Sequence, residues 1–246
     1  MKVLKEIAAR ICALWAMTWF IATMLIVFIP IWVIGLWPEP KRTLLLCNLF
    51  RVWMGFFFFI TGMRLRKKGL EHFKKGETYI VVCNHNTLLD VPVSTPGIPG
   101  ANKTIAKIEM SRIPLFGMIY KRGSVLLDRK SDESRKASYT KMKEVLDLGI
   151  HMCIYPEGTR NKTKEPLQRF HDGAFRLAVD TKHAILPALI FNTKKIFPND
   201  KVFYFLPGCI EMHFLPPIEP GTLTPEQLRE KIFAEMKNYY VQHSNQ

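Results

Sequence analysis

The stretch YIVVCNHNTLLD, residues 79–90, decides the fold class of this chain. Its first five residues form a short apolar run rich in β-branched side chains, which is typical of a buried strand. Asn84 and His85 follow at the point where such a strand ends. In open α/β sheets, ligands bind at the carboxyl edge of the strands. The stretch therefore predicts an α/β domain with His85 at its ligand-binding edge.

A second stretch, MCIYPEGTR at residues 152–160, repeats this arrangement. Residues 152–155 are apolar enough for a strand, and residues 156–160 form the loop that leaves its carboxyl end. Because the carboxyl ends of parallel strands share one edge, we expect both loops to face a single cleft.

The two loops carry residues that suit one reaction. His85 stands five residues before Asp90. We expect Asp90 about one turn inside the following helix. A helical turn rises roughly 5.4 Å, so the carboxylate can reach back to the His85 ring and make it a general base. Arg160 follows the turn-prone pair Gly158-Thr159, which favours a rigid guanidinium fork for phosphate or carboxylate.

Neither feature is specific alone. A His-x4-Asp pair arises by chance, and a lone histidine is more often a core or surface residue. A lone arginine is more often half of a surface ion pair. The two stretches together, each after an apolar strand, indicate an enzyme that deprotonates one group while it holds an anion.

The remainder of residues 63–246 alternates between strand and helix patterns, so we predict a mixed, mostly parallel sheet flanked by helices. Residues 202–206 and 209–215 are predicted to form a hairpin. Residues 224–227, Thr-Pro-Glu-Gln, form a capping box with proline at the first helical position, which predicts a final amphipathic helix. Other strands are expected at 104–106, 124–127 and 184–191, and other helices at 108–120, 132–148 and 173–181.

Residues 1–62 are predicted to form a separate membrane-associated pair of helices. No charged residue lies in 11–37, and residues 43–63 are again mostly apolar. Pro30 is expected to kink or end the first helix, and residues 38–40, Pro-Glu-Pro, to separate the two. A secretory signal peptide is the alternative, but the apolar run is long and no small-x-small cleavage site follows it.

The second of these helices carries a polar and small-residue stripe. Asn48, Arg51, Gly55 and Gly62 fall near one helical face. An arginine at the bilayer centre costs at least about 2.5 kcal/mol, so we expect this helix to lie in the interface or to pack on the first helix. Cations flank both segments, which favours a hairpin that re-enters the cytoplasmic face of the cell inner membrane. These cations are Lys2, Lys5, Arg10, Lys41, Arg42, Arg64, Arg66, Lys67 and Lys68.

Composition fits an enzyme at a membrane surface. The formal net charge is +14, and residues 1–70 hold ten Lys/Arg and two Asp/Glu, a net of +8. The five scattered cysteines argue against a disulfide framework and for a reducing cytosol. With no CxxC or HExxH string, no metal site is expected. Residues 97–104 nearly spell a nucleotide P-loop, but the last glycine and the preceding strand are missing.

Four motifs in order give the chain a family resemblance. It resembles the glycerolipid acyltransferase superfamily, and within it the PlsC-type 1-acyl-sn-glycerol-3-phosphate acyltransferases, over about residues 63–216. The first motif, N-H-x4-D, is matched by Asn84, His85 and Asp90. The second is matched by Lys107, Glu109, Met110, Pro114, Gly117 and Arg129, the third by residues 155–160, and the fourth by Leu186, Pro187 and Ala188. The first and third motifs are specific as a pair, whereas the fourth alone is not.

The chain departs from the family pattern at two places. Asn86-Thr87 stands where the family often has Gln-Ser. Residues 170–174, Phe-His-Asp-Gly-Ala, stand where many members have Phe-Lys-Lys-Gly-Ala, which replaces two cations near the acceptor site. The second departure concerns the identity of the acceptor lipid and not the His85–Asp90 pair.

The resemblance implies direct acyl transfer from acyl carrier protein or coenzyme A to the free hydroxyl of lysophosphatidic acid, giving phosphatidic acid. It implies His85 as the base, Asp90 as its orienting carboxylate, and Lys107 with Arg160 at the acceptor phosphate. Glu157 is expected to orient the Arg160 loop or to contact the acceptor glycerol, and Gly158 and Thr159 complete the implied acceptor loop. Membrane lipids, the lysophosphatidic acid and the acyl thioester are the implied partners, with no nucleic acid, metal or other cofactor.

Three alternatives stay open on the sequence alone. The acceptor could be another lyso-lipid, such as lyso-ornithine or lyso-glycine lipid. The protein could be a non-catalytic binder of anionic membranes, although His85 and Asp90 argue for catalysis. It could also be a membrane hydrolase with a Ser-His-Asp set, but no G-x-S-x-G string is present.

Overall fold

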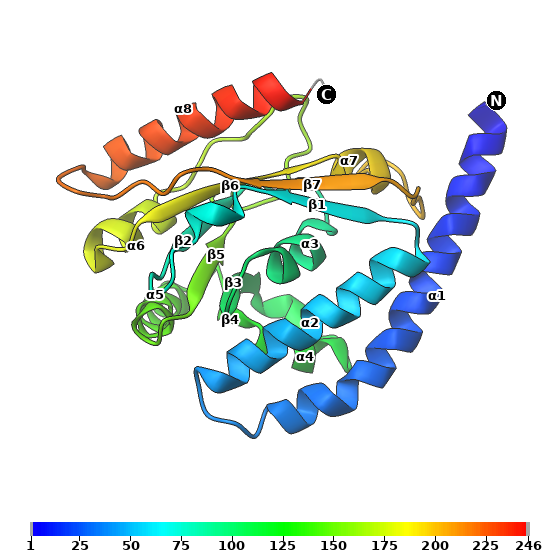
Figure 1. The fold of residues 1–246 in the computed structure, drawn as a ribbon, viewed down its shortest axis with the longest axis horizontal. Coiled ribbons are helices and arrows are strands. Elements are labelled where there is room, and N and C mark those ends of the chain that lie inside the picture. Colours follow the sequence, from blue (N-terminus) through cyan, green and yellow to red (C-terminus); the bar gives the residue numbers. More distant parts are fainter. Residues whose placement is uncertain (1, 245–246) are drawn as a thin grey trace.

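The apolar run of residues 79–83 supplies strand β2 (Ile80–Cys83), which lies at the centre of a seven-stranded sheet (Figure 1). The computed structural model describes residues 2–244. The strand order is β1-β7-β6-β2-β5-β3-β4, and every neighbouring pair is parallel except β6 with β7. The other strands are β1 (Arg64–Lys68), β3 (Asn102–Lys107), β4 (Ser124–Leu127), β5 (His151–Ile154), β6 (Ile185–Phe191) and β7 (Cys209–Phe214). The predicted mixed, mostly parallel sheet is confirmed.

Helices cover both faces of this sheet (Figure 1). One face is covered by α5 (Asp132–Asp147), α6 (Gly173–Thr181) and α8 (Pro225–His243). The other is covered by α2 (Lys41–Ile60) and α3 (Asp90–Gly97), with α1 (Lys2–Ile34) packed outside α2. Shorter helices are η1 (Leu70–His72), η2 (Ile108–Arg112), α4 (Phe116–Arg122) and α7 (Thr193–Ile196).

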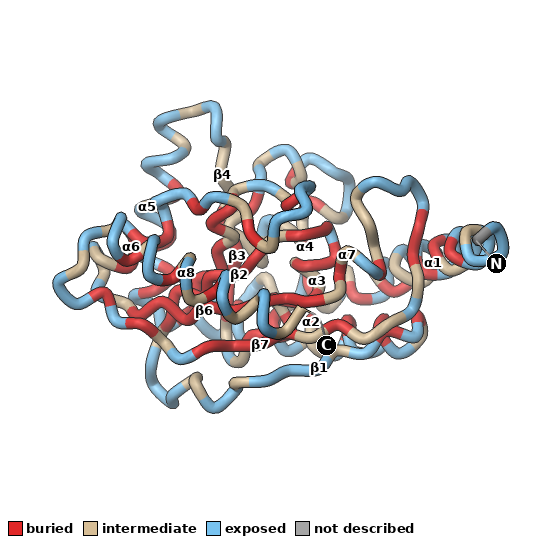
Figure 2. Tube along the Cα trace, turned by 90° about the horizontal axis from the view of Figure 1, so that it is seen from above, coloured by how far each residue is buried: buried red, intermediate tan, exposed pale blue. Residues whose placement is uncertain are grey.

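The central strand is apolar on both sides because both of its faces are buried. Ile80 and Val82 belong to the core under α5, α6 and α8, whereas Val81 and Cys83 belong to the core under α2 and α3. Figure 2 shows the same central strands as the most continuously buried part of the chain. This alternation fixes the faces of the next residues, so that Asn84 and His85 leave β2 toward opposite sides of the sheet.

The two N-terminal helices form the predicted hairpin, and both are long and apolar enough to cross a membrane. Of the two effects predicted for Pro30, a kink or an end, the end is excluded, because α1 continues through Pro30 to Ile34. The outer face of α1 is apolar and exposed, in the manner of a lipid-facing surface. Its exposed residues include Val3, Leu4, Ile7, Ile11, Leu14, Trp15, Ile21, Leu25, Ile26, Ile29 and Trp32.

Helix α2 has a different environment from α1. Its inner side chains Trp53, Met54 and Phe57 are buried in the same core as Val81 of β2. The predicted boundary at residues 62 and 63 therefore separates two elements, α2 and β1, that share one core. A chain beginning at residue 63 would leave the α2-facing side of the sheet uncovered.

The Arg51 side chain of the polar stripe does not pack on α1 but contacts the connection from α3 to β3, and the expected place of the stripe in the membrane interface stays a prediction. The Arg51 guanidinium donates to the Ile98 carbonyl at 2.7 Å and to the Gly100 carbonyl, and to Asn48 Oδ1 at 2.6 Å. These carbonyls lie in the connection from α3 to β3, where backbone acceptors would otherwise lack a donor. Arg51 therefore joins α2 to the connection between α3 and β3.

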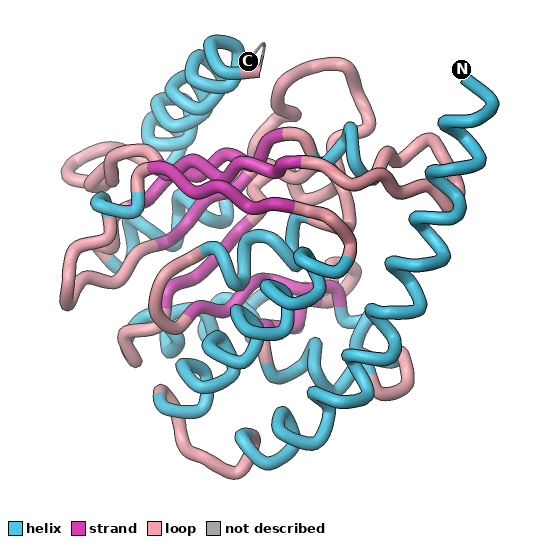
Figure 3. The backbone as a smooth tube through the Cα atoms, turned by 45° about the vertical axis from the view of Figure 1, so that its right-hand side comes forward, coloured by secondary structure: helices cyan, strands magenta, loops and turns pink. Residues whose placement is uncertain are grey.

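The turn of the hairpin is also tied to the sheet. Lys103 on β3 donates to the Glu39 carboxylate at 2.7 Å, and Thr43 and Arg42 donate to the same group. Burial alone would raise the pKa of Glu39, but these hydrogen bonds lower it to about 2. The turn is therefore held against the sheet by a charged, hydrogen-bonded group, and the hairpin lies along the flank of the α/β fold (Figure 3).

Three local predictions were wrong. Residues 202–206 form no strand, and β7 pairs instead with β6 and β1. The helix predicted over 108–120 is split into η2 and α4. Strand β1 was missed, because its sequence RLRKK is charged and mostly exposed, as suits the edge of a sheet.

Candidate active site

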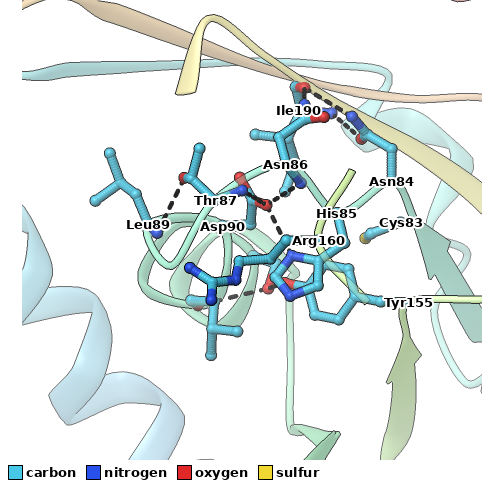
Figure 4. Close-up of polar contacts among 12 residues, drawn as sticks. Cys83, Asn84, His85, Asn86, Thr87, Leu89, Asp90, Tyr155, Arg160 and Ile190 are labelled. Atoms are coloured by element: carbon cyan, nitrogen blue, oxygen red, sulfur yellow. Dashed lines mark hydrogen bonds and ion pairs between the residues drawn. The ribbon is translucent and has the colours of Figure 1, made fainter. Parts of the chain in front are cut away.

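The catalytic loop, residues 84–90, and the arginine loop, residues 155–161, lie side by side at the carboxyl edge of the sheet (Figure 4). They follow β2 and β5, which pair in parallel with Val82 opposite Ile154. The backbone N–H of Asn161 donates a hydrogen bond to the backbone carbonyl of His85 at 2.6 Å, which joins the two loops directly. The convergence expected from two strand-ending motifs is therefore present.

His85 and Asp90 form a hydrogen-bonded pair. His85 Nδ1 lies 2.8 Å from Asp90 Oδ2, and the Asp90 side chain is fully buried. The same oxygen accepts the backbone amides of Asn86 at 2.5 Å and Thr87 at 2.7 Å. Asp90 is the first residue of α3 and not one turn inside it, which corrects the prediction. The contact exists because the catalytic loop wraps around the carboxylate, and not because a helix folds back.

An aromatic ring packs against the His85 ring. The Tyr155 ring lies 4.4 Å away, centroid to centroid, and the Tyr155 hydroxyl is 2.7 Å from Ser94 Oγ. Burial, reinforced by neighbouring acidic groups, raises the pKa of Tyr155, so this hydroxyl stays neutral. Because Nδ1 faces Asp90, Nε2 is the ring nitrogen left for a substrate.

Glu157 braces the catalytic loop from the arginine loop. Its Oε1 accepts a hydrogen bond from the backbone N–H of His85 at 2.8 Å, and its Oε2 accepts one from the backbone N–H of Gln168 at 3.0 Å. The side chain is buried. The geometry therefore assigns Glu157 to the support of the His85 backbone, and a contact with the acceptor glycerol stays a prediction.

The end of the arginine loop is open to solvent. Gly158 has a φ of +68°, and a Cβ there would meet the His171 ring at 2.9 Å, so glycine is needed for two reasons. Thr159 is exposed and Arg160 is half-buried. The Arg160 guanidinium donates to Asn199 Oδ1 at 3.5 Å, and Figure 4 shows its side chain at the same sheet edge as His85.

Known proteins resemble this chain in sequence. The family model described as Acyltransferase matches residues 64–191. A 1-acyl-sn-glycerol-3-phosphate acyltransferase from Helicobacter pylori is 32% identical over 188 residues, covering 75% of this chain and 78% of that protein. The chain belongs to the acyltransferase family.

Other comparisons extend this result to the whole fold. Mouse 1-acyl-sn-glycerol-3-phosphate acyltransferase alpha is 27% identical over 172 residues, and the acyltransferase chain spans 60% of its length. The crystal structure of the 1-acyl-sn-glycerophosphate acyltransferase PlsC from Thermotoga maritima superposes with a TM-score of 0.80 at 24% identity. That match covers 96% of both chains, including the two N-terminal helices.

Lys107, the second predicted cation of the acyltransferase, lies one strand further along the same edge. It ends β3, which pairs with β5, and its side chain is exposed. Among the described residues no hydrogen bond or ion pair holds its ammonium group. Lys107 is thus available to a ligand at this edge, but the structure does not join it to the Arg160 side chain.

Two asparagines support the acyltransferase site, and the sequence interpretation gave neither a role. The Asn84 side chain bridges to β6, accepting the Ile190 amide at 2.7 Å and donating to the Ile190 carbonyl at 3.0 Å. Asn199 Nδ2 donates to the Asn86 carbonyl at 2.5 Å. Asn84 lies in a motif, but Asn199 lies in a loop with no recognisable signal. Within residues 2–244, no three potential metal ligands gather at one place.

The Glu157 brace makes the stability of the acyltransferase depend on pH. Burial raises the pKa of Glu157 from 4.5 to about 7. Between these two pKa values Glu157 is protonated in the folded state and ionised in the unfolded state. Proton binding by Glu157 therefore stabilises the folded state at low pH, and this stabilisation is lost as pH rises from about 4.5 to about 7. Glu157→Gln cannot titrate, so its free energy of unfolding should fall less than that of the wild type between pH 5 and 7.5. Denaturant unfolding in one detergent would measure this, and equal pH slopes would contradict it.

Proposed function

We propose that this acyltransferase moves a fatty acyl group from an acyl thioester to the free hydroxyl of 1-acyl-sn-glycerol-3-phosphate, making phosphatidic acid. The observation that carries the proposal is the His85–Asp90 pair at 2.8 Å with the Arg160 guanidinium at the same edge. Relatives from Helicobacter pylori, mouse and yeast are named for acylation of this acceptor. The alternative acceptors differ in the group that Arg160 would hold.

The proposed chemistry needs only one proton carrier. Asp90 accepts the Nδ1 hydrogen, which leaves Nε2 of His85 free to take the proton of the acceptor hydroxyl. As that proton leaves, the oxygen attacks the thioester carbonyl carbon and forms a tetrahedral intermediate. The carbon–sulfur bond then breaks, and the proton on Nε2 passes to the departing thiolate. The acceptor is itself the nucleophile, so no acyl-enzyme is required.

Asp90 supports both stages of this reaction. Its buried carboxylate sets the orientation of the imidazole and stabilises the imidazolium that forms during attack. Because three donors converge on Oδ2, the carboxylate has little freedom to move. The base is therefore positioned before the substrate arrives, which avoids reorganisation during the reaction.

The proposed acceptor site holds the phosphate on cations of neighbouring strands. Arg160 offers a planar fork that matches phosphate oxygens, and Lys107 adds an exposed ammonium group at the same sheet edge. We propose either acyl carrier protein or coenzyme A as the thiol carrier, since both are anionic and the chain carries a formal charge of +14.

We further propose that the protein works at the cytoplasmic face of the inner membrane. The exposed apolar side of α1 is a surface for the bilayer, and cations flank the hairpin. All five cysteines are free thiols, which suits a reducing compartment.

Replacing Arg160 tests the acceptor assignment. Arg160→Ala should lower kcat/KM for lysophosphatidate by about 100-fold, mainly through KM, because a charge-assisted, bidentate contact is lost. Arg160→Lys should lose less, since a point charge remains. Both losses should shrink with a neutral monoacylglycerol, which never made the contact. Initial rates with both acceptors would measure this.

Lys162→Ala is the matched control, because Lys162 is an exposed cation two residues away. It should change neither acceptor's KM by more than about twofold, as expected for a screened surface charge. Equal losses on both acceptors in Arg160→Ala would mean that Arg160 supports the loop and does not hold phosphate. The lysophosphatidate assignment would then be wrong or would need another cation.

A further inference from the structure

The loop between α7 and β7, residues 197–208, lies against the first turns of α1 (Figures 1 and 3). The Phe205 amide donates to the Ala9 carbonyl at 3.3 Å. Arg10 donates to the Val202 carbonyl at 2.9 Å and to the Phe203 carbonyl at 3.3 Å. An ion pair between Lys201 and Glu6 adds a third connection. The loop is thus fastened to the part of α1 that is furthest from the hairpin turn.

The outermost part of this loop is apolar. Val202 is 88% exposed and Phe203 is 43% exposed. Phe203 also has a φ of +53°, an unfavourable conformation for a non-glycine residue that is usually kept only where function requires it. The exposed α1 side chains beside the loop are likewise apolar, namely Val3, Leu4, Ile7 and Ile11. Loop and helix thus both present exposed apolar side chains, interspersed with the exposed charged residues Lys5, Arg10, Asp200 and Lys201.

The base of the same loop reaches the active site. Asn199, three residues before Val202, donates to the Asn86 carbonyl in the catalytic loop at 2.5 Å and accepts from Arg160 at 3.5 Å. Its amide thus holds the guanidinium beside the loop that carries the proposed base. One short segment connects the apolar surface to the cation proposed to hold the acceptor phosphate.

We infer that the 197–208 loop is a second lipid-contact surface, and that Asn199 is a positioning residue that holds Arg160 for an acceptor arriving from that lipid. This inference rests on the proposed function. The lipid bilayer is the partner because the loop continues the apolar face of α1. The nearby cations Arg10 and Lys201 are engaged by backbone carbonyls and by Glu6, so they do not form a free basic patch for an acidic carrier protein.

The lipid contact can be measured without any enzyme activity. Val202→Trp adds a sixth tryptophan to the five of the chain, and Val241→Trp adds one on α8, where residue 241 is also exposed. On vesicles of phosphatidylglycerol and phosphatidylethanolamine, lipids brominated near the headgroup should quench the added emission of Val202→Trp. They should not quench that of Val241→Trp. No additional quenching in vesicle-bound Val202→Trp would overturn the lipid contact.

Kinetics test the coupling. Val202→Asp should raise the apparent KM for long-chain lysophosphatidate in vesicles by about tenfold, because an apolar contact with lipid is replaced by a charge. The defect should shrink with a short-chain monomeric lysophosphatidate. Val241→Asp is the control and should match the wild type with both acceptors. Equal kinetics of the two aspartate variants on vesicles would overturn the inference.

Asn199→Ala should raise KM for both lysophosphatidates by about tenfold, as expected when a hydrogen bond to a charged group is lost. Because the variant also loses the hydrogen bond to the Asn86 carbonyl, it should lower kcat a few-fold, and to the same extent for every acceptor, while KM for monoacylglycerol stays unchanged. A general structural defect would instead raise KM for monoacylglycerol as much as for the lysophosphatidates. Unchanged KM in Asn199→Ala would overturn the positioning role. A wild type that does not acylate lysophosphatidate would refute the proposed function, while the quenching experiment would still decide the lipid contact.

Discussion

Replacing His85 with alanine should lower acyl transfer by about 10⁴-fold, to the level of the uncatalysed background, with the fold intact. The reason is that Nδ1 of His85 is bound to Asp90 at 2.8 Å, so Nε2 is the ring nitrogen left to take the proton of the acceptor hydroxyl. The neighbouring Tyr155 is held neutral by its raised pKa and cannot replace it. Steady-state rates with lysophosphatidate and an acyl thioester, at saturating concentrations of both, would measure the loss.

His85→Asn provides the matched control for structure. An asparagine amide can still donate a hydrogen bond to Asp90, but it cannot carry a proton to and from the substrate. Both variants should therefore be inactive, and His85→Asn should keep the thermal unfolding temperature closer to that of the wild type. Activity above about a tenth of wild type in either variant would show that another group is the base.

The sequence was sufficient for the sheet and for the meeting of the two loops, because both depend on local patterns. The run at residues 79–83 is apolar at every position, which requires burial on both faces and so a central parallel strand. Two motifs at the ends of two such strands must then share an edge. These inferences need no knowledge of which distant segments pack together.

In helix α2 the pattern of apolar residues does not predict whether a side chain faces the protein core or the outside. Phe57 and Phe59 are two residues apart and chemically identical, yet Phe57 is 6% exposed and Phe59 is 83% exposed. One faces the sheet and the other faces outward. Hydropathy measures the preference to leave water, and it is the same whether the destination is a protein core or a bilayer. Only the placement of the sheet separates them, which is why the contacts of Arg51 with the Ile98 and Gly100 carbonyls were not predicted.

Asn199 was missed for a different reason. Its partners, Asn86 and Arg160, lie 113 and 39 residues away along the chain. Asparagine is common in irregular loops, so its presence there carries no signal. The contact depends on how the 197–208 loop docks on α1, and the wrong prediction of a strand at 202–206 hid that docking.

Replacing Asp90 with asparagine should lower kcat by about 10²- to 10⁴-fold while the protein stays folded. All three hydrogen bonds to Asp90 converge on Oδ2, and Oδ1 has no partner among the described residues. An amide oxygen placed at the Oδ2 position can accept all three. The imidazole orientation is then preserved, and the loss in rate reports the negative charge that stabilises the imidazolium.

Comparison with Asp90→Ala distinguishes the effect of the lost negative charge from the effect of the lost hydrogen bonds that hold the loop. Without an acceptor, the buried amides of Asn86 and Thr87 lose their partner, at a cost of about 1–3 kcal/mol each in the free energy of unfolding. Asp90→Ala should therefore be both inactive and clearly less stable than Asp90→Asn. Thermal and denaturant unfolding, together with kcat for each variant, would test this. If Asp90→Asn were as unstable as Asp90→Ala, its amide would not have taken the Oδ2 position, and its lost activity would reflect a displaced His85 and not a missing charge.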